Sequence, residues 1–473
     1  MGQSLEAILF LEDMNDGAPL ELGTEKVGKL LKQYAMPAII AMTASSLYNM
    51  VDSIYIGQGC GAMAISGLAI TFPLMNLSAA FGTLVGVGGA TLISVLLGQK
   101  NYPVAQKVLS NIFLLNLLIG VIFSAISLAF LEPILRFFGA SDSTLPYARE
   151  YLIPILSGNI VTHLYFGLNS IVRVSGHPRK AMYATILTVG LNTALDPLFI
   201  FGFNMGIQGA AIATVLSQSV SLVWIMYTLM DKREFLHFSR ESFGIDWRIA
   251  GRSLSIGMAP FLMNVAACFV IIFINNQMKR YGGDLNIGAY GIVNRLMFFF
   301  IMIIMGFNQG MQPIAGYNYG AKQYDRVMKV MHLTMFWASV ITCSCFAVAM
   351  LCPRAAVSLF THDKEMIELA ARGFRIAVMV FPVVGMQMVI SNLFQCLGLA
   401  RRAILLSLSR QLIFLIPCLV VLPLFFGADG VWYSMPASDF LAALVAEIML
   451  RRLIGQFRAN KVEAPEISVE NSF

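Results

Sequence analysis

The chain has 473 residues, of which 58% are hydrophobic and only 12% are charged. Soluble globular domains carry about 25% charged residues, so this composition excludes a soluble globular protein. The net charge of +6 does not indicate nucleic-acid binding, because the basic residues form short clusters between apolar stretches rather than one patch.

Apolar stretches of about 20 residues, the length that crosses a bilayer core, recur along the whole chain. The polar, acidic first 30 residues predict a cytoplasmic tail without a cleavable signal peptide. We therefore predict an all-α membrane protein. Its twelve transmembrane helices are expected at residues 36–57, 64–97, 108–131, 146–172, 181–203, 207–230, 250–278, 287–315, 330–352, 369–392, 404–424 and 430–451.

The basic residues orient these helices, because cytoplasmic loops of membrane proteins carry the excess of Lys and Arg. With the N-terminus inside, most of the 32 Lys and Arg residues fall in inner segments, such as the group from Lys232 to Arg252. We expect both termini in the cytoplasm of a bacterium, and the protein as a multi-pass component of its inner membrane.

The two halves of the chain repeat each other. The segment Gly98-Gln-Lys-Asn-Tyr102 aligns with Gly320-Ala-Lys-Gln-Tyr324, and further matches follow in order. Six helices in each copy predict two bundles related by a pseudo-two-fold axis along the membrane normal. The expected organisation is a tail at 1–30, an N-lobe at 31–230, a linker at 231–249, a C-lobe at 250–452 and a tail at 453–473. Such repeats are typical of transporters with alternating access.

Acidic residues inside the predicted spans need an explanation, because an ionisable group in hydrocarbon costs at least about 2.5 kcal/mol. Asp52, Asp196 and Asp439 are such residues, whereas Glu447 lies near a cytoplasmic end. They either face a functional cavity or form an internal hydrogen bond or ion pair. Both interpretations stay open for each residue.

Depth brings part of this set together. At about 1.5 Å per residue, Asp52, Asp196 and Thr214 lie roughly 8–11 Å below the outer surface on three helices of the first half. Asn192 lies one turn from Asp196 on the same helix face. Pro197 cannot donate a backbone hydrogen bond, which predicts a local kink beside the acid.

These four residues supply carboxylate, amide and hydroxyl oxygens in a poorly solvated place, which suits a proton or Na⁺. Close, desolvated carboxylates favour binding of a proton. In the second copy Asn275 and Leu422 stand where Asp52 and Asp196 stand in the first. We therefore predict that ion coupling belongs to the first half.

Other residues are less informative. Arg295 either lines the substrate cavity or pairs with a neighbour such as Asp439, and His163 is expected to be a hydrogen-bonded core histidine. The seven cysteines are expected to be buried apolar residues. The sequence has no phosphate-binding loop, no His-Glu-x-x-His and no Gly-x-Ser-x-Gly motif, so we expect no enzyme, no catalytic residues, no cofactor and no resident metal. A transporter without a nucleotide site is expected to use an ion gradient.

Several segments resemble the multidrug and toxic compound extrusion (MATE) family, in particular its branch of DinF and MepA proteins. They are Ser46-Leu-Tyr-Asn-Met-Val-Asp-Ser-Ile-Tyr-Ile-Gly57, Gly190-Leu-Asn-Thr-Ala-Leu-Asp-Pro-Leu-Phe-Ile-Phe-Gly202, Gly206-Ile-Gln-Gly-Ala-Ala211 and Ala315-Gly-Tyr-Asn-Tyr-Gly-Ala-Lys322. The first resembles the acid of helix 1 in the family, and the second its Asn-x-x-x-Asp-Pro motif.

The resemblance implies export of organic, often cationic compounds by H⁺ or Na⁺ antiport, and hence antibiotic resistance. It implies that Asp52, Asn192, Asp196 and Thr214 form the cation or proton site, with Tyr48 lining the cavity. Arg295 and Asp439 remain further cavity candidates. The family's second-lobe sodium site is not expected, because the region of helix 7 reads Asn264-Val-Ala-Ala-Cys268.

The expected partners are small organic substrates and the lipid bilayer, and we expect a monomer. The alternative function is a flippase for a lipid-linked precursor, since the same superfamily contains such proteins. The acidic site in the first half favours small cationic substrates over that alternative.

Overall fold

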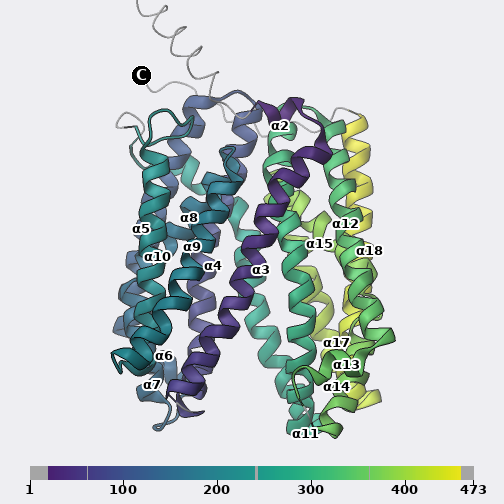
Figure 1. Cartoon of the computed structure of the whole chain (residues 1–473). Helices are drawn as coiled ribbons and strands as arrows, with labels where there is room; N and C mark the ends of the chain where they lie inside the picture. Colours follow the sequence, from purple (N-terminus) through teal and green to yellow (C-terminus); the bar gives the residue numbers. More distant parts are fainter. Residues whose placement is uncertain (1–19, 61, 240–242, 362, 460–473) are drawn as a thin grey trace, which may run out of the picture. The chain divides into compact units, whose positions relative to one another are not determined.

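The computed structural model describes residues 20–60, 62–239, 243–361 and 363–459. Every regular element in these ranges is a helix (Figure 1). The helices are α2 (Glu21–Thr24), α3 (Val27–Cys60), α4 (Ala62–Gly98), α5 (Tyr102–Ala129), α6 (Leu131–Phe137), α7 (Leu145–Ser157), α8 (Asn159–Val174), α9 (Pro178–Pro197), η1 (Leu198–Gly202), α10 (Gly206–Met230), α11 (Trp247–Gly320), α12 (Tyr324–Leu351), α13 (Pro353–Ser358), α14 (Lys364–Ala377), α15 (Phe381–Cys396), α16 (Ala400–Leu408), η2 (Ser409–Leu415), α17 (Ile416–Phe426) and α18 (Ala428–Arg458).

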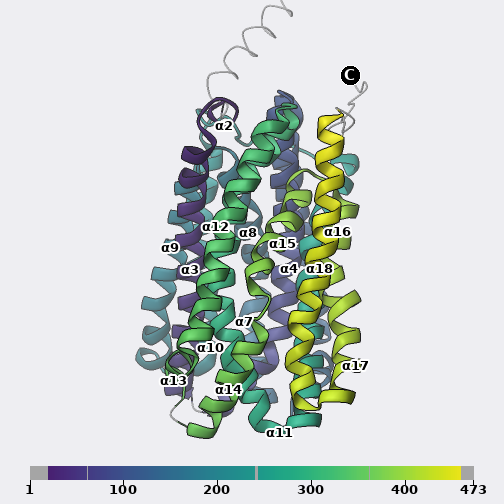
Figure 2. The same ribbon diagram turned by 90° about the vertical axis from the view of Figure 1, so that its right-hand side faces the viewer.

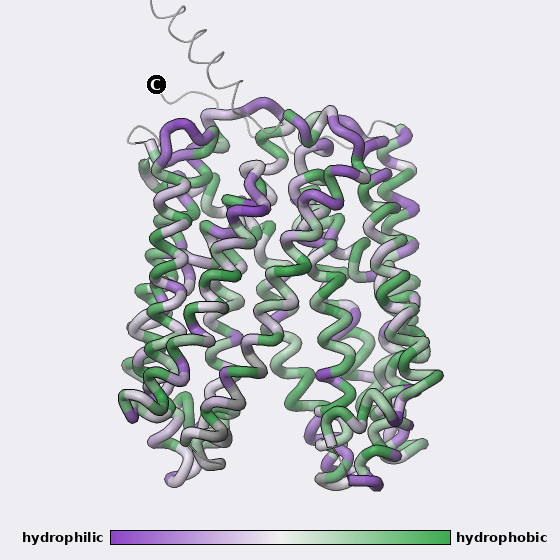
Figure 3. The backbone as a smooth tube through the Cα atoms, in the orientation of Figure 1, coloured by the Kyte–Doolittle hydropathy of each residue, from purple (hydrophilic) through white to green (hydrophobic). Residues whose placement is uncertain are grey.

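Eight helical segments in the described ranges are long and apolar enough to cross a membrane, and two bent pairs raise the number to ten. Two of the eight segments, Trp247–Gly283 and Leu285–Gly320, meet within α11 at Gly283, whose φ of 72° only glycine adopts easily. The long helices α3 and α18 account for the other two predicted spans. Hydrophobic residues follow the lengths of the helices, and hydrophilic ones gather at helix ends (Figure 3). The predicted all-α membrane fold is confirmed.

The two bent pairs are α7 with α8 and α14 with α15, each bent by 55°. They correspond to the fourth and tenth predicted spans, which are equivalent positions in the sequence repeat. Proline explains both bends, because it removes a backbone donor from the helical ladder. Pro154 lies in the last turn of α7, and Pro382 lies in the first turn of α15.

Contacts group the chain into two compact units. The first contains Gln33–Ile93 and Asn101–Cys268, and the second contains Glu21–Lys32, Ser94–Lys100 and the chain from Phe269 onward. Helices α3, α4 and α11 each pass from one unit to the other. At these three places the units divide the chain differently from the lobes expected at 31–230 and 250–452.

In the first unit, a cluster of buried residues joins α3, α4, α7, η1 and α10. Ile56, Tyr151, Ile200 and Ile207 belong to it. Helix α9 packs along α10, and α5 packs along α8. This cluster holds together the helices that carry the predicted ion site.

In the second unit, α12, α15 and α18 pack on one another (Figure 2). Trp432 of α18 and Phe374 of α14 lie in the core of this unit. A π-helical segment, η2, interrupts the eleventh span before α17.

The described part of the predicted N-terminal tail is folded. Leu22 of α2 is fully buried, and the guanidinium of Arg326 donates hydrogen bonds to the carbonyl oxygens of Leu22 and Glu25 at 3.0 and 2.7 Å. The side chain of Asn318 donates to the Leu22 carbonyl at 2.9 Å. Residues 20–30 are therefore anchored to the second unit, because one buried leucine and three hydrogen bonds hold α2 in place.

Candidate functional site

The predicted coupling residues come from three helices of the first unit (Figure 1). Helix α3 carries Tyr48 and Asp52, α9 carries Asn192 and Asp196, and α10 carries Thr214. The pairs on α3 and α9 are each four residues apart, so both side chains of a pair lie on one helix face.

The apolar cluster of the first unit lies one helical turn from this site. Asp52 precedes Ile56 by four residues, and Asp196 precedes Ile200 by four. Asp52 is 7% exposed, Asn192 is 1% exposed and Asp196 is fully buried. The same packing that forms the core thus holds two acidic side chains away from solvent.

Thr214 connects the helices. Its hydroxyl lies 3.3 Å from the Tyr48 hydroxyl, and the amide of Asn192 donates to the Thr214 hydroxyl at 3.3 Å. The same amide nitrogen lies 3.2 Å from Oδ1 of Asp196 and donates to it. One continuous polar network therefore runs from α3 through α10 to α9.

The carboxyl groups of Asp52 and Asp196 are hydrogen-bonding neighbours. Two carboxyl groups can share a hydrogen bond only when one of them carries a proton, because ionised carboxylates are acceptors only. The geometry therefore suits a pair that holds a proton between its members.

Three buried oxygen atoms at this place accept no hydrogen bond: Oδ1 of Asp52, Oδ2 of Asp196 and Oδ1 of Asn192. Buried polar atoms without partners are uncommon and call for a ligand or a proton. Carboxylate and amide oxygens are the donors that hard cations prefer. The described residues include no group of three or more His, Cys, Asp or Glu side chains arranged for a metal ion. The oxygen set fits transient binding of H⁺ or Na⁺ better than a resident transition metal.

Tyr151 of α7 is a further member of the site that the sequence analysis missed. Its side chain is 2% exposed and interacts electrostatically with Asp52, Tyr48 and Asp196. No motif surrounds it, and its span is the bent pair of α7 and α8. Only the packing of α7 against the other helices places it here.

Asp439 and Arg295 lie in the second unit, apart from this network. Asp439 forms an ion pair with Arg410 of η2, with 2.6 Å between Arg410 Nε and Asp439 Oδ1. Arg295 is exposed on α11. The suggested pairing of Arg295 with Asp439 is therefore wrong, because the interrupted helix around η2 presents Arg410 to the acid instead.

His163 is fully buried on α8. Its Nε2 atom lies 3.3 Å from both the hydroxyl of Ser78 and the amide nitrogen of Asn159. Its Nδ1 atom has no partner. The expected hydrogen-bonded core histidine is thus found with one of its two ring nitrogens engaged.

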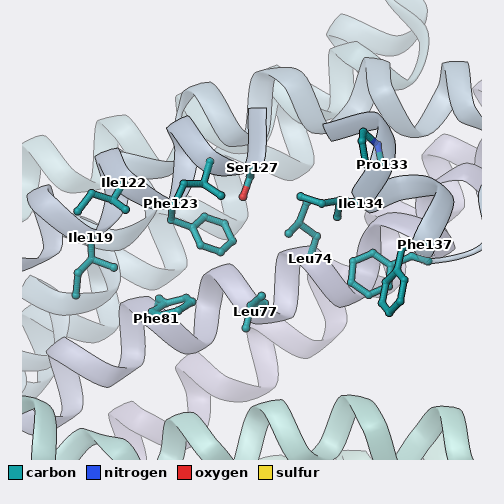
Figure 4. A pocket seen from close by; sticks show the side chains of 12 residues that line it. Leu74, Leu77, Phe81, Ile119, Ile122, Phe123, Ser127, Pro133, Ile134 and Phe137 are labelled. Atoms are coloured by element: carbon teal, nitrogen blue, oxygen red, sulfur yellow. The ribbon is translucent and has the colours of Figure 1, made fainter. Parts of the chain in front are cut away.

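An apolar pocket of about 630 Å³ lies between α4, α5 and α6 of the first unit (Figure 4). Phe81, Phe123 and Phe137 line it, and Ser127 is its single polar residue. None of the predicted coupling residues contributes to it. It has the phenylalanine lining, but not the methionine lining, that the composition suggested for a substrate cavity.

Comparison with known proteins places this geometry in a family. The MatE family model matches residues 37–198 and 257–420, so each half of the chain matches once. The multidrug export protein MepA of Staphylococcus haemolyticus (strain JCSC1435) is 29% identical over 93% of this chain and 96% of its own length. MepA of Staphylococcus aureus (strain NCTC 8325 / PS 47) is 28% identical over 90% and 93%.

Solved structures agree. The MATE multidrug transporter DinF-BH, solved in complex with rhodamine 6G, is 37% identical over 93% of this chain and 99% of its own, with a TM-score of 0.86. An outward-facing MATE family transporter of the MOP superfamily superimposes with a TM-score of 0.88 at 24% identity, covering 93% of this chain and 98% of its own. With a duplicated family match over most of its length and a shared all-α fold, the chain belongs to the MatE family of MATE multidrug transporters.

Proposed function

We propose that this protein is a secondary active multidrug efflux transporter. It exports organic, chiefly cationic compounds across the cytoplasmic membrane in exchange for H⁺ or Na⁺, with both termini inside and no enzymatic step. The observation that carries the proposal is the buried pair of Asp52 and Asp196 with their unpartnered oxygen atoms in the first unit.

The relatives support the transported class. Two MepA proteins are named multidrug export proteins, and DinF-BH was solved with rhodamine 6G bound. An acidic buried site attracts organic cations for the same reason that it attracts H⁺ or Na⁺, because an uncompensated negative charge in a poorly solvated place is costly.

The proposed mechanism is exchange at one site. In the outward-open state the coupling ion replaces the substrate at Asp52 and Asp196. Neutralising these charges then favours the conformation of the first unit that is closed to the outside. A ligand shifts such an equilibrium only by its difference in affinity for the two conformations, and a buried charge that is present in one state and neutral in the other supplies that difference.

The test is efflux of a fluorescent organic cation into everted membrane vesicles under separately imposed H⁺ and Na⁺ gradients. We expect Asp52→Asn and Asp196→Asn to lower gradient-driven transport by about 5- to 150-fold, the usual range of coupling between two binding sites. The matched control is Asp142→Asn, which removes an acid whose side chain is 92% exposed and should leave transport unchanged.

The ion that supports transport in the wild-type protein identifies the coupling ion. Normal transport by both site variants at matched expression would contradict the assignment of the site. Absence of transport for every cation tested would contradict the efflux proposal and favour a flippase for a lipid-linked precursor.

A further inference from the structure

A second buried charge of the first unit lies outside the acidic site. Arg173 occupies the last turn of α8 and is only 9% exposed. An arginine stays protonated under all conditions relevant to a protein. A charge at such a position within a membrane protein usually has a partner or marks a ligand pathway.

No acid compensates Arg173. In the part of the chain that the structure describes, Tyr165 is the one titratable group that interacts electrostatically with it, and it forms no ion pair or hydrogen bond. The carbonyl groups at the C-terminal end of α8 carry partial negative charge, which stabilises a cation only in part. A full negative charge is missing from this place.

Neutral polar groups surround the guanidinium. Tyr165, Asn169 and Arg173 are four residues apart on α8 and therefore share one face. The Tyr165 hydroxyl and the Asn169 amide donate to the hydroxyl of Thr185 on α9 at 3.4 and 3.3 Å. Oδ1 of Asn169 is buried and has no partner. One cation and an open acceptor thus stand among hydroxyl and amide groups.

The polar face of α9 continues from here to the acidic site. Thr185 is followed by Thr188, whose hydroxyl donates to Ser221 of α10 at 2.7 Å, and then by Asn192 and Asp196 at intervals of four residues. From Thr188 to Asp196 the helix rises by about 12 Å. A polar strip of the first unit therefore has a cation at one end and two acids at the other.

We propose that Arg173 binds the anionic oxygen group, a carboxylate, of zwitterionic substrates whose cationic end faces Asp52 and Asp196. This inference rests on the proposed efflux function and deepens it, because it extends the substrate class from cations to zwitterions. A guanidinium suits this task, since its planar donors match both oxygens of a carboxylate.

The experiment compares two dyes on the purified full-length protein by fluorescence anisotropy. Rhodamine 6G carries an ester, and its hydrolysed form carries a free carboxylate on the same cationic ring system. We expect Arg173→Gln to weaken binding of the acid dye by at least about tenfold and to leave binding of the ester dye unchanged. Arg173→Lys, which keeps the charge but not the planar donors, should retain part of the affinity for the acid dye.

Arg179→Gln is the matched control, because it removes an exposed arginine six residues away and should affect neither dye. An equal loss for both dyes in Arg173→Gln would show that the residue acts on the fold, and thermal melting would confirm it. A loss of the acid dye in Arg179→Gln as well would show a general charge effect. Either outcome overturns the inference and leaves the proposed function standing.

Competition with a short-chain phosphatidylglycerol separates a substrate from a lipid. If that lipid binds in an Arg173-dependent way and the acid dye does not, the anion is a lipid phosphate and the inference is overturned. If the wild-type protein binds neither dye, the proposed function itself fails, and the inference fails with it.

Discussion

At the scale of single residues, Thr214 decides whether the acidic site holds together. Its hydroxyl contacts Tyr48 of α3 and Asn192 of α9, so one side chain links three helices. The sequence placed Thr214 near the two acids by depth alone. Its role as the connecting group emerges only from the contacts.

Thr214→Val keeps the shape of the side chain and removes the hydroxyl. It leaves Tyr48 and Asn192 without that partner, and each unsatisfied buried group costs about 1–3 kcal/mol. We expect a lower melting temperature and roughly tenfold slower gradient-driven export, whereas Thr214→Ser should behave like wild type. Equal transport by the Val and Ser variants would show that the hydroxyl plays no part.

Asp439 illustrates the alternative fate of a membrane acid, since its ion pair with Arg410 satisfies its charge within the second unit. Breaking a buried ion pair on one side typically costs about 3–5 kcal/mol, and replacing both partners by apolar residues is often neutral. We expect Asp439→Asn to be strongly destabilised in thermal melting, and the double variant Arg410→Met, Asp439→Leu to recover most of the loss. Loss of transport by a fully stable Asp439→Asn would instead make this acid a functional group.

At the scale of elements, irregular helical turns accompany both buried charged sites. The π-helical segment η1 begins directly after Asp196 and Pro197, where the proline predicted a kink, and η2 carries Arg410. These segments lie in the fifth and eleventh spans, which are equivalent in the repeat. A π turn re-aims the side chains around it, and such turns are frequent at functional sites.

Two repeat-equivalent glycines, Gly98 of α4 and Gly320 of α11, make reciprocal contacts in the second unit. A Cβ atom on Gly98 would lie 1.9 Å from the Tyr317 carbonyl oxygen, and one on Gly320 would lie 2.0 Å from the Val95 carbonyl oxygen. The reciprocity indicates a local two-fold relation between these two helix ends. Only glycine permits backbones to approach so closely.

We therefore expect Gly320→Ala to destabilise the protein by about 1–3 kcal/mol, the usual result of overpacking. Gly291→Ala in the same helix is the matched control, because nothing lies within 4 Å of its Cβ position. The control should be neutral or stabilising by about 0.5–1 kcal/mol, because alanine favours helix. Thermal melting of the two variants side by side checks this, and a stable Gly320→Ala would contradict the close contact.

At the scale of the whole molecule, the distribution of basic residues predicts which loops face the cytoplasm. A background without the seven native cysteines allows single cysteines to report each side. Asp142→Cys, in a predicted outer loop, should react with a membrane-impermeant maleimide in intact cells, and Arg233→Cys, in the predicted inner linker, should react only after permeabilisation. Both positions are exposed. The reverse pattern would invert the topology and contradict export by the proposed mechanism.

The sequence by itself determined the class of fold, the spans, the duplication and the residues of the acidic site. These properties depend on hydropathy, on helical period and on spacing along one helix, all of which are local. Asp52 is conspicuous because it is an acid in an apolar span, and Asn192 and Asp196 share a face because they are four residues apart. The duplicated match to the MatE family agrees with the repeat that the aligned segments indicated.

Only the tertiary structure decided which side chains meet across helices. It paired Asp439 with Arg410 rather than Arg295, brought Tyr151 to the acidic site and left Arg173 without an acid. The rotation of each helix about its axis, and the proline bends and π turns that change it, set these contacts. A shift of one residue turns a side chain by about 100°, so neither hydropathy nor spacing in the sequence specifies the partner across a helix interface.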